Sequence, residues 1–242
     1  MLIDGFTLFG SWPGLPYDHP IDHLLNGLNR NKIDRACTLA TQGIFFDDAS
    51  GNETTWTVCQ QDPRLVPIGI ADPRDGGLDQ VDLCKERGFK LMALFPAAQE
   101  WSIRSIVARR LFRLLSEAGL PVLIQAGNDG DASAILEATQ GMDVPIILLD
   151  VSVRTLNEAI NVVQLRPQTY LSTRLLCGGD TIEYLVQAIG PEALIFSSQF
   201  PISCFSSAFL TAQYATINDA ARQAIMGGNI DKLLQAQVGA AT

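Results

Sequence analysis

Polar side chains stand directly after several short apolar runs of this sequence, at positions where they could share one site. Gln125 follows the run PVLI and Asp150 follows PIILL, while Arg174 comes just after TYLST. Ser198 and Gln199 follow the run ALIFS. A carboxylate such as that of Asp150 can serve as a general acid or base. The planar fork of an arginine can bind a carboxylate through two parallel hydrogen bonds.

Two interpretations of Arg174 remain open at this level. In one, Arg174 binds the carboxylate of a small ligand. In the other, it forms a salt bridge with Asp150 that serves the structure alone, because a buried charge needs a partner in either case.

Histidine and cysteine give the sequence two further candidate sites. The only two histidines, His19 and His23, are four positions apart, and each follows an aspartate. Side chains at this spacing share one face of a helix, so the pair could hold a metal ion, although such a pair is more often plain surface. Cys177 and Cys204 could act as nucleophiles with one histidine as base, yet unpaired cysteines are more often inert.

The elements that must position these residues form eight repeats of a short β-rich run followed by a helical stretch. Continuous apolar runs such as VPIILL are typical of parallel strands buried on both faces. The length fits one barrel, and no linker divides the chain. We therefore predict a single α/β domain over residues 1–242, a (β/α)8 TIM barrel. The expected strands are Leu2–Phe9, Ile33–Ala40, Leu65–Ile70, Phe89–Phe95, Pro121–Ala126, Pro145–Asp150, Thr169–Thr173 and Ala193–Ser197.

Residues that begin or end helices lie between these strands. Gly88 and Gly119 stand where a helix C-cap favours a left-handed residue. Asp180 and Asn218 are expected to cap the helices that follow them, and Pro20 fits a first helical turn.

Composition favours a globular domain and excludes several partners. Hydrophobic residues make up 47% of the chain and charged residues 18%, with a formal net charge of −9. An acidic chain without a phosphate-tracking surface predicts no nucleic-acid partner. The basic cluster of one helical stretch is expected on its solvated outer face and comprises Arg104, Arg109, Arg110 and Arg113.

Cysteine usage and the N-terminal segment indicate a cytoplasmic protein. The five cysteines are odd in number and lack a CxxC pair, which argues against a disulfide framework and a zinc knuckle. The segment MLIDGFTLFG lacks the features of a signal peptide, and no apolar run is long enough to span a bilayer. We expect no targeting and no membrane partner.

Six segments occur along the chain in the order of a known family. After the opening IDGFTL they are RLVPIGIADPRD, GFKLMALFP, LSEAGLPVLIQAG, VPIILLDVS, ALIFSSQFP and IMGGNIDKLL. With these segments the chain resembles the amidohydrolase-related (amidohydrolase 2) metal-dependent hydrolases and decarboxylases, whose barrels open with an Asp-x-His-x-His strand. The resemblance covers the whole chain and implies a site at the C-terminal ends of the barrel strands.

The metal-ligand positions that this resemblance implies hold other residues here. Phe6 and Leu8 stand where the first strand of the family has two histidines. Gln125 and Asp150 replace the histidines of the fifth and sixth strands. Gln199 stands where the eighth strand has an aspartate that binds the metal and acts as general base.

These replacements remove most of the chemistry that a catalytic metal needs. Such a zinc ion takes about three imidazole or carboxylate ligands, and Asp150 alone offers a strong one. Gln199 cannot serve as a base, because a neutral amide does not accept a proton near pH 7. We predict no metal and no other cofactor. Phe95 also replaces a histidine, so Phe6, Leu8 and Phe95 are expected to form an apolar pocket floor below Trp12 and Trp101.

Two classes of function fit this pattern. The first is a non-catalytic relative that binds a small molecule, such as a carboxylate, or is the inactive partner of an active paralogue. The alternative is a metal-independent hydrolase (a lactonase) or decarboxylase in which Asp150 is the catalytic acid or base and Arg174 orients an anionic substrate. The apolar residues Phe6 and Leu8 favour the first. The predicted pocket comprises Phe6, Leu8, Phe95, Gln125, Asp150, Arg174, Ser198 and Gln199, and association with a second copy is a further expectation.

Overall fold

Nine strands form one sheet in the computed structural model of the protein, which describes residues 1–16, 18–74 and 77–236. Neighbouring strands follow chain order, except that β2 lies at the outer edge beside β1, and only the β1–β2 pairing is antiparallel. The strands are β1 (Ile3–Ser11), β2 (Asp18–His19), β3 (Arg35–Ala40), β4 (Leu65–Ile70), β5 (Leu91–Leu94), β6 (Val122–Gln125), β7 (Ile146–Leu149), β8 (Thr169–Ser172) and β9 (Leu194–Ile195). All eight predicted strands are confirmed, with ends displaced by at most two residues. A two-residue strand such as β2 carries no alternation that a sequence pattern could reveal.

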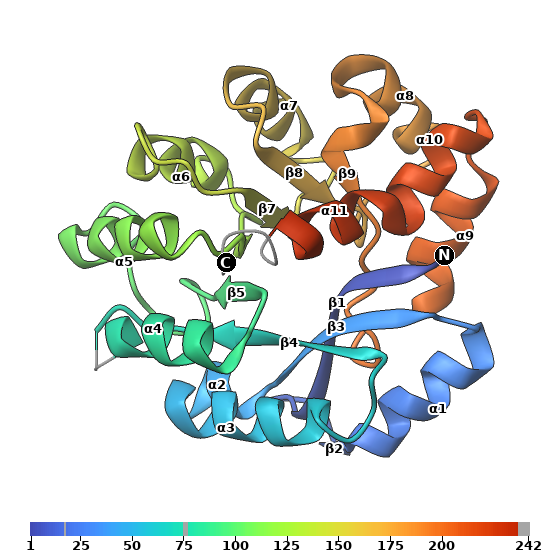
Figure 1. Ribbon diagram of the computed structural model, residues 1–242. Coiled ribbons are helices and arrows are strands. Elements are labelled where there is room, and N and C mark those ends of the chain that lie inside the picture. Colours follow the sequence, from blue (N-terminus) through green and yellow to red (C-terminus); the bar gives the residue numbers. More distant parts are fainter. Residues whose placement is uncertain (17, 75–76, 237–242) are drawn as a thin grey trace.

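Backbone hydrogen bonds between β1 and the segment after β9 close this sheet into a barrel. The Gly5 N–H donates to the Phe196 oxygen at 2.9 Å. The Gln199 N–H donates to the Phe6 oxygen at 2.8 Å. In Figure 1 the strands surround a common centre and most of the helices lie outside them, whereas α11 crosses the centre. The predicted (β/α)8 barrel is therefore confirmed.

Most of the helices lie around the outside of the barrel in chain order, and α11 lies across one of its ends (Figure 1). They are α1 (Ile21–Asn31), α2 (Gln42–Phe45), α3 (Asp48–Cys59), α4 (Gly77–Arg87), α5 (Ile106–Ala118), α6 (Asp131–Ala138), α7 (Leu156–Leu165), α8 (Thr181–Ile189), α9 (Phe205–Tyr214), α10 (Asp219–Gln223) and α11 (Asn229–Ala236). Short turns of 3-10 and π geometry occupy Pro191–Ala193 and Ala224–Gly228. Within the described residues, no helix has the length and apolar character needed to cross a membrane.

The helix ends agree with the sequence at most positions. Gly119 ends α5 in the left-handed conformation, with φ of 70°. The Asn218 side chain accepts a hydrogen bond from the Ala221 N–H at 2.8 Å and so caps α10. The prediction for Asp180 is wrong, because this residue precedes α8 with φ of 57° and its side chain makes no capping bond. The left-handed backbone there turns the carboxylate away from the first helical turn.

Alternate residues of the strands divide the core into two layers. One set packs outward against the helices, and the other fills the barrel interior. In β7, for example, Ile146 and Leu148 face the helices, whereas Ile147 and Leu149 belong to the interior. This two-sided burial explains why the strands consist of continuous apolar runs. The basic cluster on α5 is exposed, as predicted.

Helix α11 packs against the barrel interior. Its residues Ile230, Leu233 and Leu234 are buried in the same cluster as Ile3, which begins β1. The helix therefore closes the end of the barrel at which the strands begin, and the opposite end carries the loops that follow the strands.

Asp4 joins β1 to the segment after β9 through a fully buried carboxylate. It accepts hydrogen bonds from the N–H of Ser198 (3.0 Å), from the hydroxyl of Ser198 and from the N–H of Phe6 (3.2 Å). Burial raises the pKa of Asp4 from 3.8 to about 7, even though these hydrogen bonds act in the opposite direction. A raised pKa means that folding favours the protonated acid, so its contribution to stability is full below about pH 4 and is lost as the pH rises through 7.

Replacing Asp4 by asparagine should remove this pH dependence. From pH 4 to 7 the free energy of unfolding of the wild type should fall, relative to that of Asp4→Asn, by up to about 1.4 kcal/mol per pH unit. Urea titrations at intervals across this range measure the difference. The exposed carboxylate variant Glu117→Gln should follow the wild type. If the free energies of unfolding of wild type and Asp4→Asn changed in parallel with pH, the pKa of Asp4 would be the same in the folded and unfolded chains.

Candidate functional site

Four of the predicted site residues meet at the C-terminal ends of neighbouring strands. The Gln125 amide nitrogen donates to one oxygen of Asp150 at 3.1 Å, and the Arg174 guanidinium binds the other oxygen. A second guanidinium nitrogen of Arg174 donates to the Ser203 hydroxyl at 3.4 Å. Ser203 in turn donates to the amide oxygen of Gln199 at 3.3 Å. We call these five residues the mouth network.

The backbone holds two members of the mouth network in an uncommon conformation. Asp150 has φ of 63° and Gln199 has φ of 57°, which is the left-handed region that non-glycine residues seldom adopt. Such residues cost free energy and gather at binding and catalytic sites. Asp150 directly follows β7, and Gln199 lies four residues beyond the end of β9.

Arg174 and Asp150 form an ion pair, the second of the two interpretations left open by the sequence. Their side chains are 15% and 19% exposed, so most of each charge is removed from water. Both Asp150 oxygens are occupied, one by Arg174 and one by Gln125. Each oxygen therefore has a partner within the mouth network, and Asp150 also lines an adjoining cavity. The binding of a ligand carboxylate by Arg174 stays a prediction.

The apolar pocket floor predicted from the sequence is completely buried. Phe6, Leu8 and Phe95 are at most 1% exposed, and the rings of Phe6 and Phe95 lie 6.2 Å apart between centroids. Side chains from the loops at the mouth pack onto the same interior cluster: Trp12, Ile44, Phe45 and Ile202. Hydrophobic packing therefore fills the centre of the mouth. Trp101 lies elsewhere, in the layer between strands and helices.

Ser198 does not join the mouth network. Its hydroxyl donates to Asp4 and accepts the Phe200 N–H at 2.9 Å, and the residue is 1% exposed. Ser198 therefore belongs to the seam that closes the barrel, which is the contact between β1 and the segment after β9. Sequence reasoning overlooked Asp4 and Ser203. The signal for Asp4 was an acidic residue within an apolar strand, whereas Ser203 lies in a loop without a pattern.

The residues that the resemblance assigns to metal positions do not fit a metal ion. Phe6 and Leu8 supply no donor atom, and amides are weak ligands. Asp150 already has partners at both oxygens. Across residues 1–16, 18–74 and 77–236, no group of three or more histidine, cysteine, aspartate or glutamate side chains could hold a metal.

The histidine and cysteine candidates lie outside the mouth network. The Nδ1 atoms of His19 and His23 are 3.3 Å apart, and burial lowers the pKa of His19. His23 also packs edge-on against Phe200. Cys177 and Cys204 are exposed, and Cys177 is hydrogen-bonded to the Arg174 carbonyl oxygen at 3.3 Å. Nucleophilic catalysis by one of these cysteines with a histidine as base therefore stays a prediction.

A cavity of about 430 Å³ opens beside the mouth network. Gln125 and Asp150 form one wall, and Trp101, Asn128 and Arg104 belong to the others. Its place at the ends of β5, β6 and β7 is where barrels of this type bind small molecules.

Comparison with known proteins identifies the family. Residues 43–235 match the family described as Amidohydrolase, and the chain belongs to it. Among solved structures it is similar to an uncharacterised TIM-barrel protein from Bordetella bronchiseptica, with 16% identity, a TM-score of 0.77, and coverage of 98% of this chain and 99% of that one. No curated protein matches the chain.

Two decarboxylases also share the fold. For the 2,6-dihydroxybenzoate decarboxylase from Rhizobium the identity is 12% and the TM-score 0.79, with 97% of this chain and 99% of that one covered. For the 5-carboxyvanillate decarboxylase from Sphingomonas paucimobilis the identity is 12% and the TM-score 0.72, with 97% and 98% covered. At such identities the likeness establishes the fold alone.

The ion pair of the mouth network should stabilise the protein measurably. Arg174→Met should lower the free energy of unfolding by about 2 kcal/mol, because it leaves a largely buried carboxylate without its cation. The single variants Asp150→Asn and Arg174→Met should each lower the free energy of unfolding. In the double variant Asp150→Asn/Arg174→Met this free energy should fall by about 1–2 kcal/mol less than the sum of the two single decreases. Denaturant titration of the four proteins measures this coupling.

An exposed pair provides the matched control. Arg104 and Glu137 lie 3.8 Å apart with side chains 62% and 68% exposed, so their coupling should stay below about 0.5 kcal/mol. If the Asp150–Arg174 coupling were as small as that, the mouth network would not be an element of stability.

Proposed function

We propose that this member of the amidohydrolase family is a non-catalytic protein that binds a small ligand at the mouth of its barrel. The observation that carries the proposal is the packed centre of the mouth. Phe6, Leu8 and Phe95 lie where the family's metal chemistry would need donors, and loop side chains cover them. An ion there would lose its hydration without gaining ligands, which is strongly unfavourable.

The proposed ligand is a small carboxylate held by Arg174. A guanidinium presents five donors, and Asp150 and Ser203 engage only part of them. Asp150 lines the adjoining cavity and Arg174 does not, so a ligand acid there would reach the guanidinium by displacing Asp150 from it. Two of the similar structures are named for enzymes that decarboxylate aromatic acids, which supports an acid as the ligand class.

Catalysis without a metal receives less support. The metal-independent hydrolase or decarboxylase would need Asp150 as a proton acceptor or donor toward substrate. Its two oxygens instead accept hydrogen bonds from Gln125 and Arg174, so each already has a partner within the protein. The binding hypothesis needs no such proton transfer.

The purified protein should contain no stoichiometric zinc, manganese or iron. Elemental analysis of protein prepared without chelators measures the content. As a positive control, the variant Phe6→His/Leu8→His/Gln125→His/Asp150→His/Gln199→Asp restores the donor set and should bind zinc, at some cost in stability because it buries imidazoles. About one metal per wild-type chain, lost in Asp150→Ala, would contradict the proposal.

At least one small acid should stabilise the wild type in thermal-shift measurements with aromatic and dicarboxylic acids. The ligand-induced increment should disappear in Arg174→Met and persist in Arg110→Met, which removes an exposed charge on α5. The comparison uses the increase in melting temperature that the ligand causes, because Arg174→Met also changes the melting temperature of the protein without ligand. Incubation of each stabilising acid with protein, followed by NMR, should show no product. Turnover that depends on Asp150 would instead establish the enzyme.

A further inference from the structure

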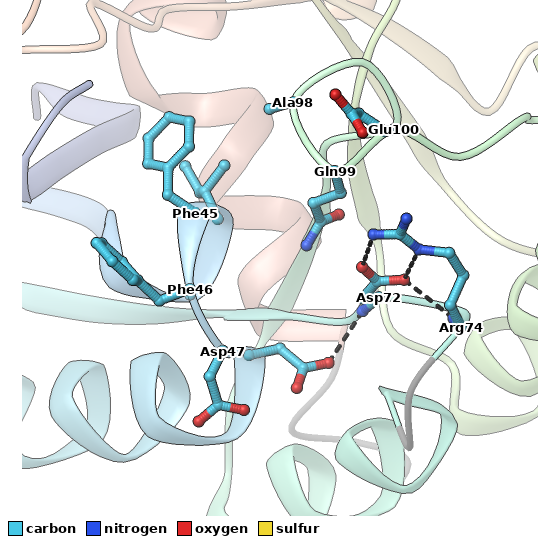
Figure 2. A pocket seen from close by; sticks show the side chains of 11 residues that line it. Phe45, Phe46, Asp47, Asp72, Arg74, Ala98, Gln99 and Glu100 are labelled. Atoms are coloured by element: carbon cyan, nitrogen blue, oxygen red, sulfur yellow. Dashed lines mark hydrogen bonds and ion pairs between the residues drawn. The ribbon is translucent and has the colours of Figure 1, made fainter. Parts of the chain in front are cut away.

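A second cavity, of about 280 Å³, lies at the rim of the mouth away from the mouth network. Its walls come from three places: the junction of α2 and α3, the loop after β4 and the loop after β5. Figure 2 shows Phe45 and Phe46 on one side of this space, and Asp72 with Arg74 on the other. None of its lining residues belongs to the mouth network. We call it the rim cavity.

Asp48 brings a desolvated carboxylate to the rim cavity. The residue is 8% exposed, and one of its oxygens accepts the Asp72 N–H at 3.0 Å. Burial raises the pKa of Asp48, and the neighbouring charges of Asp47 and Asp72 act in the same direction. No cation pairs with Asp48 in the described parts of the chain, because Arg74 binds Asp72 through two nitrogens. The carboxylate therefore retains acceptor capacity that the surrounding protein does not satisfy.

Gln99 brings an unpaired donor to the same space. It is 7% exposed, and its amide oxygen accepts the Trp101 indole N–H at 3.1 Å. An indole N–H can only donate, so this bond fixes which end of the amide is oxygen. The amide nitrogen consequently faces the other way, and in Figure 2 it points into the rim cavity. No hydrogen-bond partner is found for this nitrogen among the residues that the structure describes.

We propose that the rim cavity binds a neutral polyhydroxylated molecule of monosaccharide size. Hydroxyl groups both donate and accept, so one can donate to Asp48 while a neighbour accepts from Gln99. An ammonium ion has no acceptor to offer Gln99. A carboxylate would meet the negative charges of Asp47, Asp48 and Glu100 at short range.

Phe46 completes the site with an apolar surface. Its side chain is 82% exposed and lines the rim cavity, an uncommon position for so large a hydrophobic group. The C–H face of a sugar ring could cover this aromatic surface while its hydroxyl edge reaches Asp48 and Gln99. The two cavities share no lining residue, so the polyol and the acid proposed for Arg174 would occupy separate sites, which the Gln99–Trp101 hydrogen bond connects.

Titration of the full-length protein with D-glucose, D-galactose, D-ribose and myo-inositol tests the proposal, with saturation-transfer NMR and calorimetry as readouts. At least one of these probes should bind in the millimolar range. Gln99→Glu keeps an oxygen for Trp101 but removes the donor, and Asp48→Asn keeps an acceptor for the Asp72 N–H. Each should weaken binding at least tenfold. Phe46→Ser should weaken it several-fold, and folding is not at risk because that side chain is exposed.

Matched controls separate the rim cavity from general surface effects. Tyr214→Ser removes an aromatic ring that is 78% exposed on α9, and Gln140→Glu adds a negative charge at a glutamine on the surface. Both should bind as the wild type does. Absence of binding for all four probes, or binding unchanged in Gln99→Glu and Phe46→Ser, overturns the proposal. Binding of a small amine or acid in this cavity in place of the polyols overturns it as well.

Discussion

The seam between β1 and the segment after β9 is the contact on which the rest of the structure depends. Asp4 and Ser198 meet there although they are 194 positions apart in the chain. Without this contact β1 and β9 would be open sheet edges with unpaired backbone groups. The same seam sets the Gln199 backbone against Phe6 and thereby fixes one end of the mouth network. A buried acid at this point links the integrity of the barrel to the geometry of its mouth.

The mouth separates apolar and charged groups in space. Its centre is filled by rings and aliphatic side chains, and its polar groups lie around that centre, where water still reaches part of them. Asp150 and Arg174 neutralise each other in this ring, which avoids the cost of an isolated charge next to the apolar interior. The result leaves hollows at the rim rather than one central pocket, and each hollow has its own pattern of donors and acceptors.

The fold was largely predictable because its signals are local. Apolar runs marked each long strand, and a glycine such as Gly119 marked a helix end through its own backbone freedom. The cap at Asp180 failed because a left-handed backbone, set by the loop before it, overrode the side-chain preference. For the site, the sequence placed Asp150 and Arg174 on neighbouring strands but could not choose between ligand and ion pair. That choice, like the turn of Ser198 toward Asp4, depends on side-chain directions across the barrel, which no local pattern encodes.

The position of α11 has a consequence for how the protein is made. Its apolar residues complete the interior that β1 begins, so the first and last elements of the described chain belong to one core. During synthesis β1 emerges early and must wait for both β9 and α11 before its inner face is covered. Contacts of such long sequence separation form slowly. The nascent chain therefore exposes strand surface until α11 has been synthesised, and we expect chaperones to matter more for this barrel than for a fold built from local contacts.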